Sequence, residues 1–309
     1  MSKKNLFLGG ILVVLIFFAY IYNGPLQNWK ANKGKSDNFL SSLNLEQINR
    51  IIIARKGEET TLELVGDKWR IMGTKDFYVQ DDIMTTVLDS LKEAKESDLD
   101  LVSENEEKKQ DFGIGDDGIN LKLQEGDNLM KEFKIGKVAS DFKSTYISDF
   151  GDKKTYLVSA ALSSAFGRSD WYNKNIFSGD KETINEIRFQ YPDREFSVEK
   201  QEEEWIGVSP YKFSVSEEKI DPILNIMSNL NSPLIPEQNF EKTGLEKNLI
   251  IIEAQGEGFS NVLMVGGAYE EEDQDEVRYY YAKKGDSDNI YLITKEQKEN
   301  LEKQIWELK

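Results

Sequence analysis

The 309-residue chain contains no cysteine and no histidine. Without cysteine it has no disulfide, no thiolate nucleophile and no cysteine-ligated zinc site. Without histidine it lacks the commonest general base and the commonest imidazole metal ligand. The lack of cysteine is compatible with an oxidising compartment but does not establish one. These two absences exclude much of enzyme chemistry, and we predict no catalytic, cofactor-binding or metal-ligating residue.

Basic residues are also scarce, with 39 lysines and arginines against 56 acidic residues and a net charge of −17. Phosphate binding needs clustered lysine and arginine, so we predict no nucleic-acid partner. The charge is unevenly placed, because residues 1–35 contain five lysines and no acid. Anionic lipid headgroups should therefore attract this N-terminal part and repel the remainder of the chain.

Long apolar runs are absent except at Leu6 to Tyr22, where seventeen residues carry no charge. A helix of this length covers roughly 26 Å, near the short limit for crossing a hydrocarbon layer of about 30 Å. Tyr20 and Tyr22 would lie in the interface. No small-residue cleavage site follows the run. We predict an uncleaved transmembrane anchor over residues 1–23, with the membrane contacted through residues 6–22, in preference to a signal peptide.

The orientation of this anchor depends on the segments that flank it. Lys3 and Lys4 precede the run, whereas Lys30, Lys33 and Lys35 follow it, so the positive-inside rule gives nearly a draw. An N-terminal signal followed by one large hydrophilic region most simply exports that region. We therefore predict a single-pass protein of the inner (cytoplasmic) membrane with its C-terminal part on the periplasmic or extracellular side.

The stretch from Ile48 to Leu91 reappears as Ile184 to Met227 at a constant offset of 136 residues. The clearest matches are Ile51, Trp69, Phe77 and Val79 with Ile187, Trp205, Phe213 and Val215. A less regular match continues at Phe112-Gly113-Ile114 and Thr243-Gly244-Leu245. We predict a tandem duplication. The predicted parts are the anchor (1–23), a polar stalk (24–43), repeat one (44–167), a linker (168–180) and repeat two (181–309).

Alternating apolar residues and turn signals predict β-β-β-α followed by β-β-β-β-α in each repeat, which is an α+β fold of antiparallel sheet plus helix. We expect a helix over Asp81 to Lys95, an acidic connection from Asp98 to Glu107 and a short helix within Ser159 to Phe166. The final helix should begin at Thr294, with Gln297 completing a capping box. Its apolar side would consist of Leu301, Ile305 and Leu308.

Several residues need a choice between a structural and a functional role. Trp69 and Trp205 follow charged turns, and we interpret both as core residues. Gly113 and Gly244 should supply a backbone conformation that other residues resist. The acidic run from Glu270 to Glu276 lacks the residue order of a calcium loop, so we interpret it as a solvated hairpin loop. A catalytic carboxylate pair stays open, because spacing in the sequence does not give the distance between two side chains.

The repeated pattern resembles the bacterial domain-of-unknown-function family forty-three-forty. The resemblance rests on six short motifs together with the two glycine motifs above. The six are Trp69-Arg70-Ile71, Trp205-Ile206, Phe133-Lys134-Ile135-Gly136, Met264-Val265-Gly266, Thr145-Tyr146-Ile147 and Tyr280-Tyr281-Ala282. Trp171-Tyr172-Asn173-Lys174-Asn175-Ile176 is similar to the link between repeats in that family, although an arginine often expected there is replaced by asparagine or lysine. The resemblance implies two tandem copies in a membrane-anchored protein of unassigned activity. It also implies an association with ABC-type transporter components related to gliding-motility auxiliary proteins.

The sequence therefore favours a non-enzymatic, externally facing accessory or scaffold protein of an ABC-type transport complex. Its expected partner is an integral membrane protein, either the permease or an auxiliary subunit, and no cofactor is expected. The alternative is a carboxylate-dependent glycan hydrolase or a glycan-binding ectodomain. A deep cleft with two facing acids and aromatic platforms would favour this alternative.

The predicted orientation can be tested with a reporter enzyme that works only outside the cytosol, fused after Lys309. We expect the fusion to be active, because the anchor should export everything that follows it. A second fusion, to a reporter that works only in the cytosol, serves as the control. Activity of this second fusion alone would show that the orientation is reversed.

Overall fold

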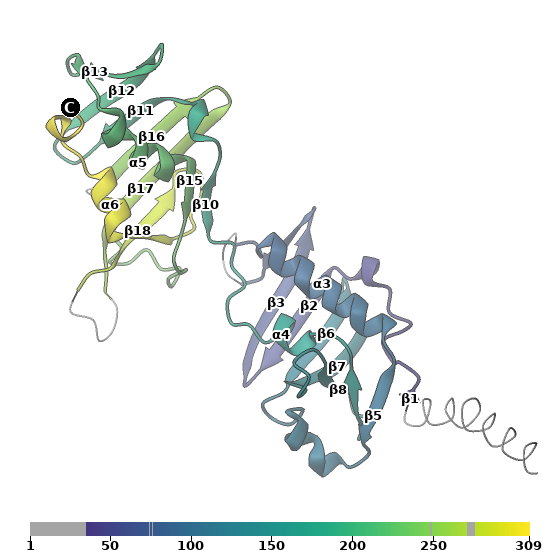
Figure 1. The fold of residues 1–309 in the computed structure, drawn as a ribbon. Helices are drawn as coiled ribbons and strands as arrows, with labels where there is room; N and C mark the ends of the chain where they lie inside the picture. The colour runs from purple at the N-terminus through teal and green to yellow at the C-terminus, as the bar shows by residue number, and fades with distance from the viewer. Residues whose placement is uncertain (1–34, 74, 76, 248, 271–275) are drawn as a thin grey trace, which may run out of the picture. The chain divides into compact units, whose positions relative to one another are not determined.

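The computed structural model describes residues 35–73, 75, 77–247, 249–270 and 276–309 (Figure 1). The predicted anchor and residues 24–34 of the predicted stalk lie outside these residues. None of the helices formed by the described residues is long and apolar enough to cross a membrane. The architecture is mixed α+β, with mostly antiparallel sheets and few helices, as the sequence predicted.

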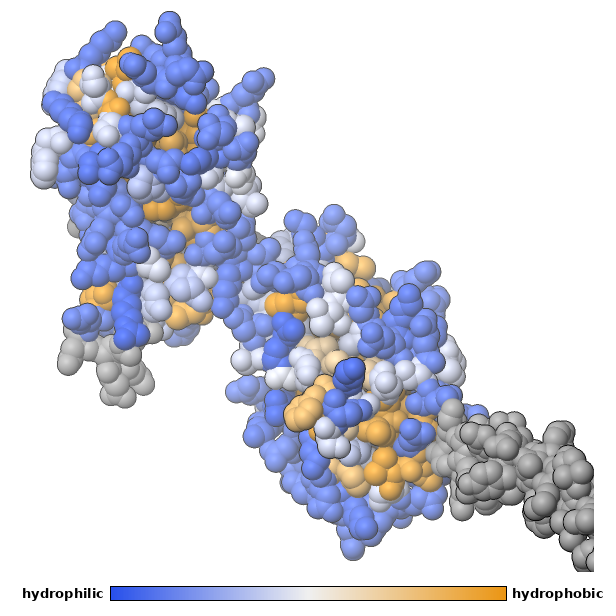
Figure 2. All heavy atoms as spheres, viewed as in Figure 1, coloured by the Kyte–Doolittle hydropathy of each residue, from blue (hydrophilic) through white to orange (hydrophobic). Residues whose placement is uncertain are grey.

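The chain divides into two compact units. Of the described residues, the first unit contains those from 35 to Leu64 together with Asp82–Ser169, and the second contains those of Val65–Asp81 together with those of Asp170–Lys309. Segment 65–81, which the sequence analysis placed in repeat one, thus groups with the C-terminal part of the chain. Figure 2 shows a largely hydrophilic surface on both units, with apolar side chains in separate patches.

The first sheet has nine strands in the order β1-β5-β9-β8-β7-β6-β2-β3-β4, and its described strand pairs are antiparallel. Its strands are β1 (Lys35–Ser36), β2 (Arg50–Arg55), β3 (Glu58–Val65), β4 (Lys68–Ile71), β5 (Leu99–Ser103), β6 (Ile119–Glu125), β7 (Asn128–Val138), β8 (Thr145–Asp149) and β9 (Thr155–Val158). The helices in this part of the chain are η1 (Leu45–Gln47), α3 (Asp81–Glu96), η2 (Glu106–Phe112) and α4 (Leu162–Phe166).

Helix α3 lies across one face of the first sheet (Figure 1). Its buried residues recur at helical spacing and include Met84, Val87 and Leu91. Burying each such side chain contributes about 1.5–3 kcal/mol. The predicted helix over Asp81 to Lys95 is therefore confirmed. Residues 38–43, which the sequence analysis assigned to the stalk, pack on this unit, and Leu40 is fully buried.

The second sheet has eight strands in the order β14-β13-β12-β11-β16-β17-β18-β19, and β10 pairs separately with β15. Its strands are β11 (Ile184–Gln190), β12 (Glu195–Gln201), β13 (Glu204–Ser209), β14 (Phe213–Ser214), β16 (Ile250–Gly256), β17 (Phe259–Tyr269), β18 (Tyr279–Lys284) and β19 (Tyr291–Thr294). The other elements are β10 (Asn175–Ser178), η3 (Lys181–Thr183), α5 (Glu217–Ser228), β15 (Asn229–Asn231), α6 (Lys295–Leu301) and η4 (Ile305–Glu307).

Backbone pairing at the start of the two sheets follows the offset of 136 residues. Ile51 pairs with Leu62 in the first sheet, and Ile187 pairs with Val198 in the second. The backbone N–H of Val79 donates to the Trp69 carbonyl at 2.7 Å, and that of Val215 donates to the Trp205 carbonyl at 3.1 Å. Both tryptophans are buried, at 8% and 7% exposure, which confirms their prediction as core residues.

Gly113 lies close to the backbone of β7, and Gly244 lies close to the backbone of β17. Gly113 and Gly244 have φ of +71° and +69°, the left-handed conformation predicted for them. A Cβ atom would lie 2.9 Å from the Lys137 nitrogen if built on Gly113, and 2.8 Å from the Gly267 nitrogen if built on Gly244. Strands β7 and β17 carry a register shift at this place, after Ile135 and after Val265. Each shift is a β-bulge, which bends the strand beside the glycine.

Strand β5 lies where the sequence analysis predicted an acidic connection, so that prediction is wrong for residues 99–103. The strand forms because Leu99 is fully buried and pairs with Val158 of β9. The flanking carboxylates of Asp98 and Asp100 dominate the local composition, and they obscure the short alternation of apolar residues.

The predicted capping box at the last helix is confirmed, since the side chains of Thr294 and Gln297 bond each other's backbone N–H. The helix ends at Leu301, however, and does not continue to Leu308. The Tyr191 hydroxyl donates to the Leu301 carbonyl at 2.7 Å and accepts from the Lys303 nitrogen at 3.0 Å. Because these bonds replace intrahelical partners, the chain leaves the helix and forms η4.

The glycine contacts predict that two glycines with the same left-handed conformation differ in how much stability the protein loses when each is replaced by alanine. Gly113→Ala should lower the free energy of unfolding by about 3 kcal/mol, because it combines backbone strain with a steric clash. Gly126→Ala should cost only about 1 kcal/mol, because Gly126 has φ of +59° with no atom near its Cβ position. Chemical denaturation of the two variants measures the difference. Equal losses would contradict the close contact at Gly113.

Candidate functional site

The main candidate site is a groove of about 720 Å³ in the second unit. It lies beside the β12–β13 hairpin, η3, β14 and the first turns of α5. Trp205, Phe213 and Leu224 supply its apolar part. The groove therefore combines an apolar lining with charged side chains from four separate elements.

The charged lining is mixed in sign. Its basic residues are Lys181, Lys200 and Lys212. Its acidic residues are Glu182, Glu203, Glu204, Glu217 and Asp221. The acids outnumber the lysines, and the groove is suited to a ligand that carries positive charge together with apolar groups.

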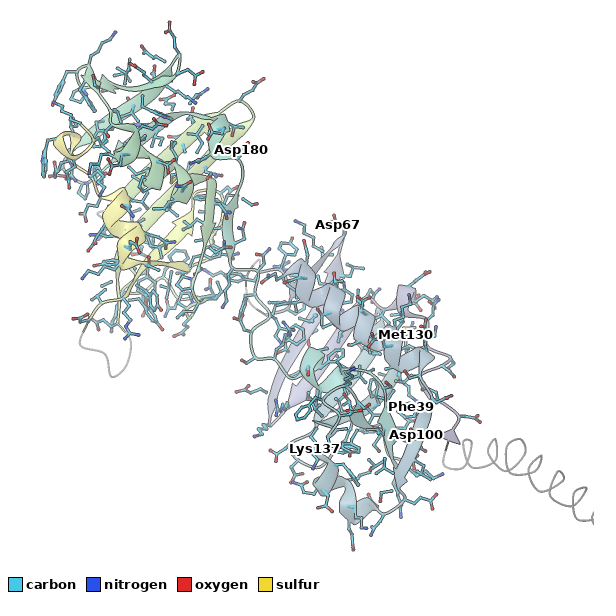
Figure 3. The ribbon with its side chains drawn as sticks, viewed as in Figure 1. Phe39, Asp67, Asp100, Met130, Lys137 and Asp180 are labelled. Atoms are coloured by element: carbon cyan, nitrogen blue, oxygen red, sulfur yellow. The ribbon has the colours of Figure 1, made fainter. Side chains whose placement is uncertain are left out.

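Local structure fixes two of the lysines. Asp180, labelled in Figure 3, caps η3 by accepting a hydrogen bond from the Glu182 nitrogen at 3.0 Å, and this turn presents Lys181. Lys200 stands opposite Trp205 in the β12–β13 ladder. Because side chains alternate along a strand, Lys200 lies on the same face of β12 as the buried Phe196 and Val198.

An ion pair crosses the groove between η3 and α5. The Lys181 Nζ lies 2.5 Å from an Asp221 carboxylate oxygen. This hydrogen bond raises the pKa of Lys181 and lowers the pKa of Asp221. A weaker pair joins Lys200 and Glu182 at 4.0 Å. Both pairs hold side chains of the lining in place, although partly exposed pairs stabilise a protein only modestly.

Three charged positions of the groove hold uncharged residues 136 positions earlier in the chain. Leu45 and Leu64 stand at the places of Lys181 and Lys200, and Thr85 stands at the place of Asp221. These three exchanges remove the residues of the Lys181–Asp221 pair and the lysine of the Lys200–Glu182 pair, so neither ion pair can form at the earlier positions. Sequence reasoning did not find this groove, because its residues come from several short consecutive elements between Lys181 and Leu224, and only the folded backbone shows which side chains face one another. Comparing the two stretches for exchanges of leucine for lysine could have indicated it.

A smaller cleft of about 230 Å³ lies in the first unit, and its lining includes Phe39 and Met130. Figure 3 labels both residues, and Figure 2 shows an apolar patch around the position of Phe39. The Phe39 ring lies 6.0 Å from the ring of Phe133, with Lys131 Nζ 4.7 Å from its centre. Lys131 is paired with Asp149 at 2.9 Å. The lining of this cleft combines apolar residues with polar ones, and Lys131, its one charged residue, is already paired.

The sequence analysis interpreted the acidic run that follows β17 as a solvated hairpin loop, and its counterpart in the first unit is the loop that follows β7. Of the acidic run from Glu270 to Glu276, residues 271–275 lie outside the described residues. In the first unit, Asp141 accepts hydrogen bonds from the Lys143 and Ser144 nitrogens and from the Ser144 hydroxyl. The bonds from Ser144 are the main cause that lowers the pKa of Asp141 to about 2. Within the described part of the chain, no group of three side chains is arranged to hold a metal ion.

The ion pair predicts a small, pH-dependent coupling between Lys181→Met and Asp221→Asn. At neutral pH the coupling in a double-mutant cycle should be favourable but small, because both side chains are more than one-third exposed. The pKa of Asp221 is lowered in the folded state, so this stabilisation is present above the unfolded pKa of about 4. It should be lost as the pH falls through the lowered pKa. Urea unfolding at several pH values measures this, and a coupling that persists after the carboxylate is protonated would contradict it.

Comparison with known proteins gives one family. Residues 69–247 match the family described as Domain of unknown function (DUF4340), which is more than half of the chain. The matched stretch begins at Trp69 and includes the motif at Gly113, the linker and the motif at Gly244, but ends before Met264-Val265-Gly266. No curated protein and no solved structure matches the chain. The chain belongs to the DUF4340 family of domains of unknown function.

Proposed function

We propose that this protein is a membrane-anchored, externally facing, non-enzymatic accessory or scaffold protein of an ABC-type transport complex. Its anchor is residues 6–22, and its partner is the permease or an auxiliary subunit. The observation that carries the proposal is the occurrence, in one chain, of this apolar segment and a β-rich unit whose groove is lined by ion pairs. The single-pass protein lies in the inner membrane with its C-terminal part on the periplasmic or extracellular side.

We also infer that the two β-rich parts are tandem copies of one module, with repeat one at 44–167, a linker at 168–180 and repeat two at 181–309. Three shared features support this inference: the ladder of the first three strands, the hydrogen bond to each tryptophan carbonyl, and the glycine contact beside a bulge. All of these are features of the backbone, so they do not depend on which residues line a surface. The second copy has Lys181 and Lys200 at the places of Leu45 and Leu64, so the surface there is charged in the second copy and apolar in the first.

The alternative of a glycan hydrolase has less support from the groove. A catalytic general acid needs a raised pKa, but the hydrogen bond from Lys181 lowers the pKa of Asp221. The indole of Trp205 is almost fully buried, so it offers little area on which a sugar ring could stack. These features favour a groove that binds a protein partner over one that performs acid–base chemistry on a glycan.

Co-purification tests the proposed complex. The full-length protein, extracted from its native membrane in a mild detergent, should bring down a permease and an ATPase in constant proportion. A variant with Leu12 and Ile16 replaced by Asp serves as the control, because charges in the apolar segment should prevent its insertion and abolish recovery of the complex. Recovery of the unaltered protein alone, under several mild conditions, would contradict the proposal.

A further inference from the structure

Part of the charge in the large groove of the second unit is not used by ion pairs. The two ion pairs described above neutralise two lysines and two acids of the lining. Three further acids of the lining form no ion pair with the described residues: Glu203, Glu204 and Glu217. Among the lysines of the lining, the same is true of Lys212. Three acids against one lysine leave a net charge of −2 for a ligand to neutralise.

The three unpaired acids stand on two sides of the groove. Glu203 lies in the turn between β12 and β13, Glu204 is the first residue of β13, and Glu217 is the first residue of α5. All three are exposed. Strands β12, β13 and β14 form one edge of the second sheet, so solvent reaches this side (Figure 1). Carboxylates on both sides of the groove can therefore bind two separate lysines of one segment through charge-assisted hydrogen bonds.

Between these acids, part of the lining is apolar. Ile206 and Val215 are half-buried, whereas Trp205, Phe213 and Leu224 are buried and keep only a small exposed area. The volume of about 720 Å³ falls within the range of about 300–1,000 Å³ that is usual for ligand pockets. The groove therefore has room for one large apolar side chain between the acids, and it does not offer an extended apolar surface.

The chain itself contains a segment of complementary composition. Residues 24–34, which lie outside the described residues, include Leu26, Trp29, Lys30 and Lys33 and no acid. The charge of this segment is +2, opposite in sign to the unpaired charge of the groove. Outside residues 1–36, no stretch of eleven residues in the sequence combines a tryptophan, two lysines and no acid. Segment 24–34 is therefore the part of the chain that suits the groove best.

The C-terminal end of segment 24–34 is fixed to the first unit. Lys35 and Ser36 form β1, which pairs with Asp100 and Leu99 of β5. The eleven residues before β1 can extend over at most about 36 Å. The proposed anchor would hold the other end at the membrane, where neighbouring molecules meet at a high effective concentration. The segment is therefore placed to reach a neighbouring molecule.

We propose that segment 24–34 of one protein molecule binds in the large groove of a second molecule. Lys30 and Lys33 pair with the acids on the two sides of the groove, and the Trp29 indole contacts the apolar lining between them. The occupant is a second molecule of the same protein, so the contact is a self-association. This inference rests on the anchor and the protein-binding groove of the proposed function, but not on the identity of its transport partner.

The lack of cysteine in the chain allows a direct test by disulfide cross-linking. Two full-length forms with different affinity tags are co-expressed, one with Ala31→Cys and one with Ser214→Cys. Ser214 is exposed and lines the groove. After treatment of the membranes with a mild oxidant, we expect a band of twice the monomer mass that carries both tags and disappears on reduction.

Ser260→Cys is the matched control for this experiment. Ser260 is exposed on β17 of the same unit and does not line the groove, so it should give at least tenfold less of the two-tag band. Absence of the band with Ser214→Cys, or an equal amount with Ser260→Cys, would overturn the proposal. A disulfide that forms only within molecules carrying both Ala31→Cys and Ser214→Cys would also overturn it, because the occupant would then be the same molecule.

Peptide binding gives an independent measurement. The probe is a peptide of residues 24–34, acetylated, amidated and labelled with a fluorophore. The protein is the full-length chain in detergent micelles with Trp29→Ala, Lys30→Gln and Lys33→Gln, so that its own segment does not compete. Fluorescence anisotropy should show saturable binding. Absence of saturable binding up to about 1 mM would overturn the proposal.

Two triple variants of this protein test the part played by the groove. Replacing its three unpaired acids by glutamine should weaken binding of the peptide at least tenfold. The control removes the same charge at three exposed positions outside the groove and should bind within twofold of the parent: Glu241→Gln, Glu257→Gln and Glu299→Gln. Equal effects of the two triple variants would show that the groove is not the binding surface.

These results can be separated from the proposed transport function. If a permease and an ATPase co-purify but neither the cross-link nor peptide binding is seen, the accessory function stands and the self-association is wrong. If the cross-link and the peptide behave as described and no transport component co-purifies, the self-association stands and the ABC-type partner is wrong.

Discussion

The structure depends on a backbone contact that only glycine permits, formed once in each unit. In the first unit Gly113, in the left-handed conformation, meets β7 at Gly136 and Lys137. In the second, Gly244 meets β17 at Gly266 and Gly267. A Cβ atom at Gly136 or at Gly266 would lie 2.3 Å from a carbonyl oxygen of the segment that crosses it. This contact fixes the bulge of the long strand, and the bulge sets the direction of the strands that follow.

The two units keep this frame and differ at their surfaces. The frame consists of backbone pairings and of buried side chains such as Ile51 and Ile187, where a change of volume or conformation costs several kcal/mol. Exposed positions tolerate change, and Lys181 and Lys200 stand 136 residues after Leu45 and Leu64 of the first unit. The two units therefore combine similar backbone pairings with different surfaces. The groove beside β14 is such a surface.

Much of the fold could be predicted from the sequence, because it follows from local rules. The alternation of apolar residues gave most strands, and the spacing of Met84, Val87 and Leu91 gave helix α3. The conformations of Gly113 and Gly244 and the capping box at Thr294 follow from equally local chemistry.

Other features depend on contacts between distant segments. The last helix stops at Leu301 because Tyr191, far away in the chain, captures its carbonyl. The grouping of segment 65–81 with the second unit depends on backbone bonds to the linker. The groove could not be predicted for a different reason: η3, β12, β14 and α5 follow one another in the chain, but each contributes only a few of the residues that line it. From a single sequence, the type of each helix or strand is easier to predict than the set of side chains that meet at a surface.

Hydrogen exchange of the full-length protein, resolved residue by residue, tests the shared frame most directly. Two copies of one frame predict that the slowest amides in the first unit lie in β6 and β7, beside Gly113 and Gly136. The slowest amides in the second unit should lie in β16 and β17, beside Gly244 and Gly266. Two results would contradict a shared frame. One is slow exchange confined to one of the two sheets, and the other is slow amides in strands of the first sheet that are not the counterparts of those in the second.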